Sequence, residues 1–122
     1  MKWCPERTVQ LKTAHETFEY TTHACTQKAA IRRGINLLQT LPRDEHDNVI
    51  LPGTIVAQIE REQDGETYIV YSPISWANIN AVVGYVDETG KVIIKQPDEI
   101  GSLNVFPPDN FQSPLRRVQT EG

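Results

Sequence analysis

The sequence lacks any long apolar run, and this absence argues against a membrane-spanning helix. A span needs roughly 18 consecutive apolar residues, whereas the uncharged stretch from Tyr68 to Val86 is interrupted by Pro73. The first residues, Met1 to Arg7, are not followed by the apolar segment that a secretory signal carries. We therefore expect a soluble cytoplasmic protein with no membrane partner, and leave open whether a host or a mobile element encodes it.

Cysteine is scarce, and glycine-rich phosphate loops are absent. Cys4 and Cys25 are the 2 cysteines of the chain, too few for the disulfide framework of a small secreted domain. Free thiols are the default expectation, and a single bridge between the two stays open.

No Gly-Lys-Ser/Thr sequence occurs, which excludes nucleotide hydrolysis by a P-loop. No cofactor is expected.

What is present is the composition of an ordinary globular domain. Hydrophobic residues make up 39% and charged residues 23% of the 122 residues, a balance too apolar for intrinsic disorder and a length suited to one core. The net charge of -4 argues against a surface devoted to nucleic acid. Residues 1–43 carry seven basic and three acidic side chains, a charge of +4, so the remainder carries -8. We expect attraction between these opposite charges to help hold the predicted helix against its sheet.

Hydrophobic periodicity predicts two strands and one helix in the first third of the chain. Apolar residues alternate with polar ones over Thr8–Lys12 and Glu16–Thr21, which indicates half-buried strands joined by either a hairpin turn or a bend. Apolar residues then recur at helical spacing over Ala24–Thr40, with Thr22 as the expected N-cap and Pro42 ending the helix. The predicted core-facing side chains are Ile31, Ile35 and Leu38, joined by Leu41 or flanked by Leu37.

The rest of the chain predicts short strands and an extended tail. Runs at residues 54–60 and 66–71 flank the turn Gln63–Gly65, and runs at 81–86 and 91–95 flank Asp87–Gly90. Short loops that end in glycine are typical of hairpins. The tail from Pro97 contains three further prolines and irregularly spaced apolar residues, which favours an extended segment docked by those residues.

These elements predict an α+β fold in a single domain, 1–122. One amphipathic helix packs on an antiparallel sheet of about five to six short strands, for which a small half-barrel is one form. The predicted segments are N-terminal strands at 1–21, the helix at 22–41, an antiparallel meander at 49–96 and the tail at 97–122. Gly34 lies inside the helix, where it costs about 1 kcal/mol relative to alanine. Either a neighbour packs closely against it or the helix is weakened.

Sulfur and imidazole groups in the first quarter suggest a metal site or a nucleophile. Cys4, His15, His23 and Cys25 are types of ligand that zinc accepts, but only His23 and Cys25 are close in sequence, without the usual knuckle spacing. Alternatively, Cys25 at a helix N-terminus is a nucleophile with His23 or His15 as base, as in a thiol-dependent hydrolase or transferase. No orienting carboxylate or oxyanion hole accompanies it, so structural roles are favoured.

Charged side chains suggest a second kind of site. The candidates for binding phosphate or an acidic partner are Lys28, Arg32, Arg33 and Arg43. The first three form a basic strip on the solvent side of the helix, which is mildly unfavourable unless Glu16 or Glu19 from the preceding strand neutralises it. The loop Asp44–Asp47 also collects metal-ligand atoms, but it lacks the spacing of a calcium loop and a solvated turn explains it.

Two apolar segments suggest protein binding. The candidate contact residues are Trp76, Asn78, Asn80, Phe106 and Phe111. Ser72–Asn80 combines an aromatic anchor with adaptable hydrogen-bonding groups, as recognition loops do, although Trp76 packing on the edge of the core is the structural alternative. The two phenylalanines of the tail either close over the domain's own sheet or anchor a partner.

No convergent set of acid, base, nucleophile and oxyanion donor can be assembled from the sequence. We therefore predict a small non-catalytic accessory protein that regulates, inhibits or helps assemble a larger protein through the Trp76 loop, the apolar tail or both. One alternative is a phosphate-bearing ligand, nucleotide or nucleic acid, on the basic strip. The other is the Cys25-dependent enzyme. The expected partner is another protein, and a homo-oligomer stays open.

Overall fold

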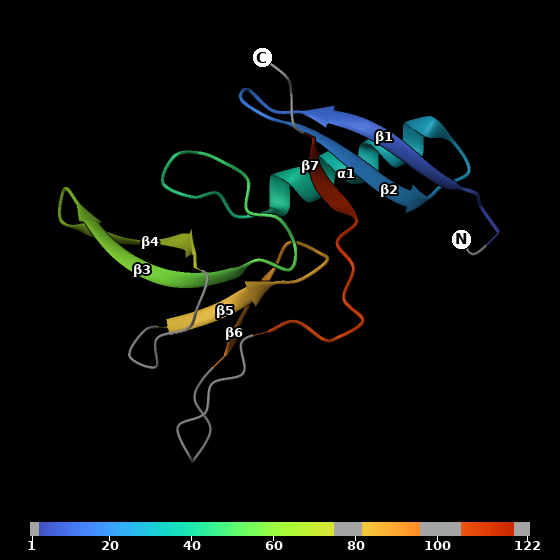
Figure 1. Ribbon diagram of the computed structural model, residues 1–122. Helices are drawn as coiled ribbons and strands as arrows, with labels where there is room; N and C mark the ends of the chain where they lie inside the picture. The colour runs from blue at the N-terminus through green and yellow to red at the C-terminus, as the bar shows by residue number, and fades with distance from the viewer. Residues whose placement is uncertain (1–2, 75–81, 96–105, 119–122) are drawn as a thin grey trace.

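The computed structural model describes residues 3–74, 82–95 and 106–118, which form one helix and seven strands in two sheets (Figure 1). The first sheet has the order β1-β2-β7 and contains β1 (Glu6–Lys12), β2 (Thr17–His23) and β7 (Leu115–Val118). The second has the order β4-β3-β5-β6 and contains β3 (Ile55–Gln63), β4 (Glu66–Pro73), β5 (Val82–Val86) and β6 (Val92–Lys95). Helix α1 spans Gln27–Thr40. The strand pairs are antiparallel, which confirms the α+β prediction, and the sheets are open rather than closed into a barrel.

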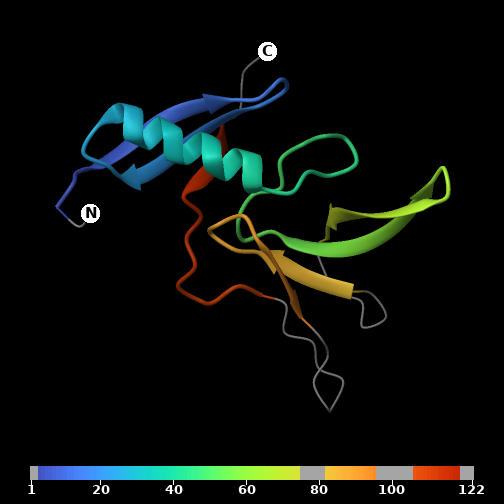
Figure 2. The ribbon, with the colours of Figure 1, turned by 180° about the vertical axis from the view of Figure 1, so that it is seen from behind.

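Helix α1 lies across one face of the three-stranded sheet (Figure 2). The predicted core-facing stripe is confirmed in part, because Leu38 is buried and half-buried Ile31 packs against the core, whereas Ile35 is exposed. The buried residues of the helix are Ala30, Gly34, Leu37 and Leu38. A Cβ at Gly34 would lie 2.5 Å from Leu11 Cδ1 and 2.9 Å from Tyr20 Cδ2. Gly34 is therefore the point of closest approach between the helix and the sheet, and its lack of a side chain sets which face is buried.

The helix begins later than predicted. It starts at Gln27 rather than near Ala24, and its N-cap is Thr26 rather than Thr22. The Thr26 hydroxyl accepts a hydrogen bond of 3.1 Å from the backbone N–H of Ala29, which is the usual N-cap contact. The helix ends at Thr40, with Leu41 as its C-cap directly before Pro42, as the proline predicted.

Both hairpins of the second sheet are confirmed, but their arrangement differs from a meander. Asp64 and Gly65 have φ values of 54° and 80°, as a two-residue turn between twisted strands requires. Gly90 has a φ of 91° in the turn between β5 and β6. However, β5 pairs with β3 and not with β4, so β3 lies between them. Strand β4 also continues through Ser72 to Pro73, residues that the sequence assigned to a loop.

The C-terminal tail contributes a strand that the sequence did not predict. Strand β7 pairs antiparallel with β2, with Leu115 opposite Tyr20. Leu115 is fully buried, and its neighbours Arg116 and Arg117 are exposed. The described end of the tail is therefore part of the first sheet.

One apolar core joins the two sheets. Phe18 from β2, Val56 from β3 and Val86 from β5 are completely buried in it. Val49 and Ile50 belong to the same cluster, so the connection between α1 and β3 links the core of the first sheet to one side of the second. Within the described ranges, no helix is long and apolar enough to cross a membrane.

Candidate functional site

The two cysteines form a disulfide, which corrects the expectation of free thiols. Cys4 precedes β1, Cys25 precedes α1, and their Cα atoms are 4.7 Å apart. A sulfur in a disulfide is neither a thiolate nucleophile nor a thiolate ligand. The structure therefore removes the proposed Cys25-dependent chemistry and both cysteines of the candidate zinc site.

The two histidines of those candidate sites are also separated. His23 pairs with Glu6 at one end of the β1–β2 hairpin. His15 lies in the turn at the other end, which is closed by a 2.9 Å hydrogen bond from the Thr13 N–H to the Glu16 carbonyl. Among the residues that the structure describes, no group of three or more His, Cys, Asp or Glu side chains could hold a metal ion.

The predicted basic strip is divided. Lys28 and Arg32 are exposed on the N-terminal half of α1. The guanidinium of Arg33 turns away and donates a hydrogen bond to a backbone carbonyl at the end of β2. Arg43 lies beyond the other end of the helix, where it pairs with Asp47 at 3.5 Å. Only Lys28 and Arg32 present their charges together.

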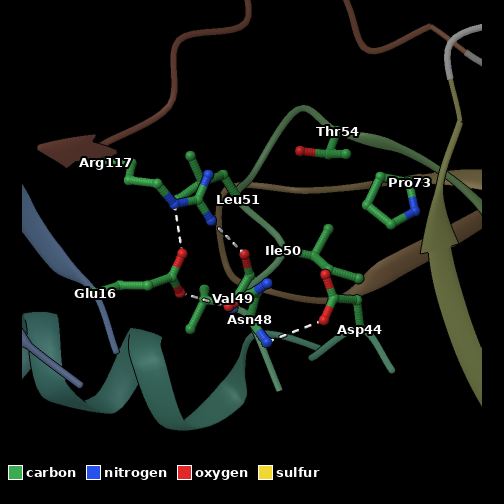
Figure 3. A pocket seen from close by; sticks show the side chains of 9 residues that line it. All are labelled: Glu16, Asp44, Asn48, Val49, Ile50, Leu51, Thr54, Pro73 and Arg117. Atoms are coloured by element: carbon green, nitrogen blue, oxygen red, sulfur yellow. Dashed lines mark hydrogen bonds and ion pairs between the residues drawn. The ribbon is translucent and has the colours of Figure 1, made fainter. Parts of the chain in front are cut away.

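The acidic residues expected to neutralise that strip pair with the C-terminal strand instead. Arg117 Nε lies 2.5 Å from Glu16 Oε1, and Arg116 pairs with Glu19 at 2.6 Å. The second Glu16 oxygen accepts the Val49 N–H at 3.0 Å, and Arg117 donates to the Val49 carbonyl at 2.8 Å. Glu16, directly before β2, and Arg117 thus join the β1–β2 hairpin, β7 and the connection between α1 and β3 (Figure 3).

These contacts line a hollow of about 440 Å³ between the two sheets (Figure 3). Asp44, Asn48 and Pro73 of β4 also line it. Asp44 accepts hydrogen bonds from two backbone N–H groups of its own loop, and the carboxylate of Glu16 is already bonded to Arg117 and Val49. The ionised groups of the hollow bond the protein to itself, which makes this a structural junction rather than a site with a free acid or base.

A different surface is left open on the second sheet. In antiparallel sheets, directly paired residues point to the same side. Val56 pairs with Gly84, which pairs with Ile94, so Ile94 shares the side of Val56 that faces the core. By the same alternation of side chains along a strand, Val82 and Ile69 lie on this side too.

The apolar core covers the Val56 side of the second sheet only near Val56 itself. Ile69 is 46% exposed, Val82 49% and Ile94 39%, although they come from three strands and face the same way as fully buried Val56. Two carboxylates also lie on this side, because Glu60 pairs with Ile69 and Glu62 pairs with Thr67. We call the set of Ile69, Val82, Ile94, Glu60 and Glu62 the uncovered sheet face.

The charges of this face are not neutralised within the described part of the chain. Glu60 and Glu62 are exposed and have no ion-pair partner there. Arg61 between them points to the other side of β3 and pairs with Glu45 at 2.5 Å. The face therefore combines apolar side chains with two carboxylates that have no ion-pair partner among the described residues.

The predicted contact residues lie in different places. Trp76, Asn78 and Asn80 are outside the described residues. Phe106 is exposed and lines a hollow beside Tyr85 and Lys95. The ring of Phe111 packs against the backbone of Gly53, where a Cβ would lie only 2.8 Å from it. Phe111 is thus engaged within its own domain.

Comparisons with protein families, with curated proteins and with solved structures find no match to this chain. The residues of the uncovered sheet face were not singled out by the sequence, because Ile69, Val82 and Ile94 have the pattern of ordinary strand residues. Only the strand order and the extent of the core show that they are exposed.

Proposed function

We propose that this chain is a non-catalytic accessory protein that binds another protein, and that the partner docks on the uncovered sheet face. The observation that supports this proposal is the exposure of Ile69, Val82 and Ile94 on one side of three strands. Single exposed apolar residues are common, whereas exposed apolar residues gathered on one surface mark interaction sites.

The charges of the face suggest the chemistry of the partner. Glu60 and Glu62 flank Ile69 without counter-ions in the described ranges. A partner that covers Ile69 brings its own side chains next to these carboxylates, so lysine or arginine beside an apolar anchor fits best. A nucleic-acid backbone is repelled by the same charges.

The proposal keeps Trp76, Asn78, Asn80 and Phe106 as candidate contact residues. Strand β4 ends at Pro73 and β5 begins at Val82, so the chain that carries Trp76 starts and ends on the second sheet. The hypothesis also states that this binding regulates, inhibits or helps to assemble the partner. The cytoplasmic location stays a prediction, and the Cys4–Cys25 disulfide weighs in favour of an oxidising compartment.

Affinity purification from the native cell tests the proposal. We compare the tagged wild-type chain with Ile94→Lys, which puts a cation on the uncovered sheet face, and with Trp3→Lys as the matched control. Trp3 is 78% exposed and lies outside both sheets. A partner that is captured by wild type and by Trp3→Lys should be lost at least tenfold from Ile94→Lys, because a buried unpaired charge at an interface is costly.

Circular dichroism must show that Ile94→Lys keeps its fold. Equal capture by all three chains would show that the partner docks elsewhere. If no protein binds the purified wild-type chain saturably, the binding function itself is wrong.

A further inference from the structure

We propose that two copies of this chain pair antiparallel through the outer edge of β4, which joins their second sheets into one continuous eight-stranded sheet. Strand β4 is at the edge in the order β4-β3-β5-β6 and pairs only with β3 in the described part of the chain. Its other edge presents a row of backbone N–H and C=O groups, which is a template for a further strand.

Strand β4 lacks the features that normally block such pairing. Edge strands are usually protected by charged residues, by proline within the strand or by shortness. The other three edge strands have them: β1 contains Glu6, Arg7 and Lys12, while β6 and β7 are four residues long and carry Lys95 or adjacent arginines. From Thr67 to Ser72, β4 has neither a charge nor a proline. Its edge is the least protected of the four.

The exposed position of β4 adds to this argument. Among the described residues, β5 pairs with β3 only over Ile55–Gln58, and the distal parts of β3 and β4 form a two-stranded ribbon that extends away from the other labelled strands (Figure 1). Tyr68 and Ile69 on this ribbon are 44% and 46% exposed. Two-stranded ribbons are marginal in water, whereas pairing with a second copy makes the ribbon the centre of a sheet.

Symmetry restricts the register of the pairing to those in which one residue of β4 lies opposite its own copy, and we place the axis at Ile69, near the middle of the uncharged segment Thr67–Ser72. A two-fold axis perpendicular to the sheet keeps the same side of both copies together, so paired residues must point to the same side. With the axis at Ile69, this residue lies opposite Ile69 of the partner subunit, and Tyr68 lies opposite Val70 of the partner subunit. Aromatic and β-branched side chains are favourable cross-strand neighbours.

In this register no close repulsion arises between like charges of the two copies, so a second copy fits the edge. Glu66 lies opposite Ser72 of the partner subunit, so no carboxylate faces another across the new strand pair. The Glu60 carboxylates of the two copies are three strand spacings apart, about 14 Å, which exceeds the screening length of about 8 Å at physiological salt. The uncovered sheet faces of the two copies lie on the same side and meet at Ile69. The inference goes beyond the proposed function and does not depend on it.

Sedimentation velocity of the full chain tests the pairing. We expect wild type to sediment as a dimer, at twice the 13.8 kDa mass of the chain, and Tyr68→Lys to dissociate it at least tenfold more easily, because a lysine on an edge strand blocks pairing. Tyr68 points to the side opposite the uncovered sheet face, together with Arg61. Ile94→Lys on the far edge is the matched control and should remain a dimer.

These two variants separate the inference from the proposed function. Ile94→Lys should lose the captured partner and keep the dimer, and Tyr68→Lys should do the reverse. A wild-type chain that stays monomeric at high concentration overturns the inference. If such a monomer instead binds a foreign strand in a Tyr68-dependent way, the edge is used but the second copy is the wrong occupant.

Cysteine cross-linking checks the register without relying on a disruptive substitution. Ile69→Cys should form a cross-linked dimer under mild oxidation, because the two residues face each other at the axis. Thr67→Cys is the control, since the Thr67 residues of the two copies are about 14 Å apart in this register, well beyond the roughly 7 Å limit between Cα atoms for a disulfide. Cross-linking through Thr67→Cys and not Ile69→Cys would exclude this pairing.

Discussion

Gly34→Ala should destabilise the protein although alanine is the better helix former. The prediction follows from the close contact between α1 and the first sheet. An added Cβ would lie 2.5 Å from Leu11 Cδ1 and 2.9 Å from Tyr20 Cδ2, with Tyr20 Cγ at 3.2 Å. Real Cβ atoms do not approach other heavy atoms at the first two distances, so the helix or the side chains must move.

Two opposing terms set the size of the effect. Replacing a helical glycine by alanine gains about 1 kcal/mol of unfolding free energy. Overpacking a close contact costs about 1–3 kcal/mol. The end of Leu11 can rotate away, but the ring of Tyr20 is buried in the core and cannot shift without moving its neighbours. The steric term therefore exceeds the gain, and we expect a net loss of about 1 kcal/mol, or about 4 °C in Tm for a domain of this size.

Urea denaturation followed by circular dichroism measures this difference. Asn36→Ala is the control, because Asn36 is exposed on the same helix and its replacement changes helix propensity without adding a contact. That variant should be stabilised by about 0.5 kcal/mol. If Gly34→Ala were stabilised as much as Asn36→Ala, the helix would not lie at this distance from β1 and β2.

Two further predictions concern the disulfide and the turn between β5 and β6. Replacing Cys4 and Cys25 together by alanine removes a bridge across a separation of 21 residues, which should lower the unfolding free energy by about 3 kcal/mol; no loss in non-reducing denaturation would mean that the bridge does not form. Partial burial raises the pKa of Asp87, but hydrogen bonds from Thr89 and Lys91 and the Lys91 charge outweigh it and hold the pKa below its ordinary value of 3.8. Asp87 therefore stabilises the fold above about pH 3.8 and loses this effect as the pH falls through its lowered pKa. The difference in unfolding free energy between wild type and Asp87→Ala should shrink over that range, and a pH-independent difference would contradict it.

The parts of the fold that the sequence predicted depend on short-range patterns. The hairpins were readable because glycine at positions 65 and 90 supplies the positive φ that the turns need. The end of the helix was readable because Pro42 excludes the helical conformation before it. In contrast, β7 has four residues, two of them arginines, which is too short for any periodicity to show.

The parts that the sequence missed depend on distant contacts. The pairing of β5 with β3 rather than β4 is set by the packing of Val56 and Val86 in the common core. In α1 the sequence offered close packing at Gly34 as one of two alternatives, but it could not name Leu11 and Tyr20 as the neighbours. Exposure of Ile69, Val82 and Ile94 is likewise a property of where the core ends. The candidate site could not be predicted from the sequence because its residues are ordinary strand residues in an unusual position.

The charge distribution of the fold leads to the same surface. The sequence suggested that opposite charges hold the helix against its sheet, but within the described residues no ion pair joins α1 to a strand. Instead, two arginines from the acidic part of the chain neutralise Glu16 and Glu19 of the basic part. Four carboxylates of the acidic part lie on the β3–β4 hairpin, those of Glu60, Glu62, Asp64 and Glu66. Glu60 and Glu62 lie beside Ile69 and have no ion-pair partner among the described residues. Negative charge therefore flanks an exposed apolar side chain on the uncovered sheet face, as a surface for a basic, apolar partner requires.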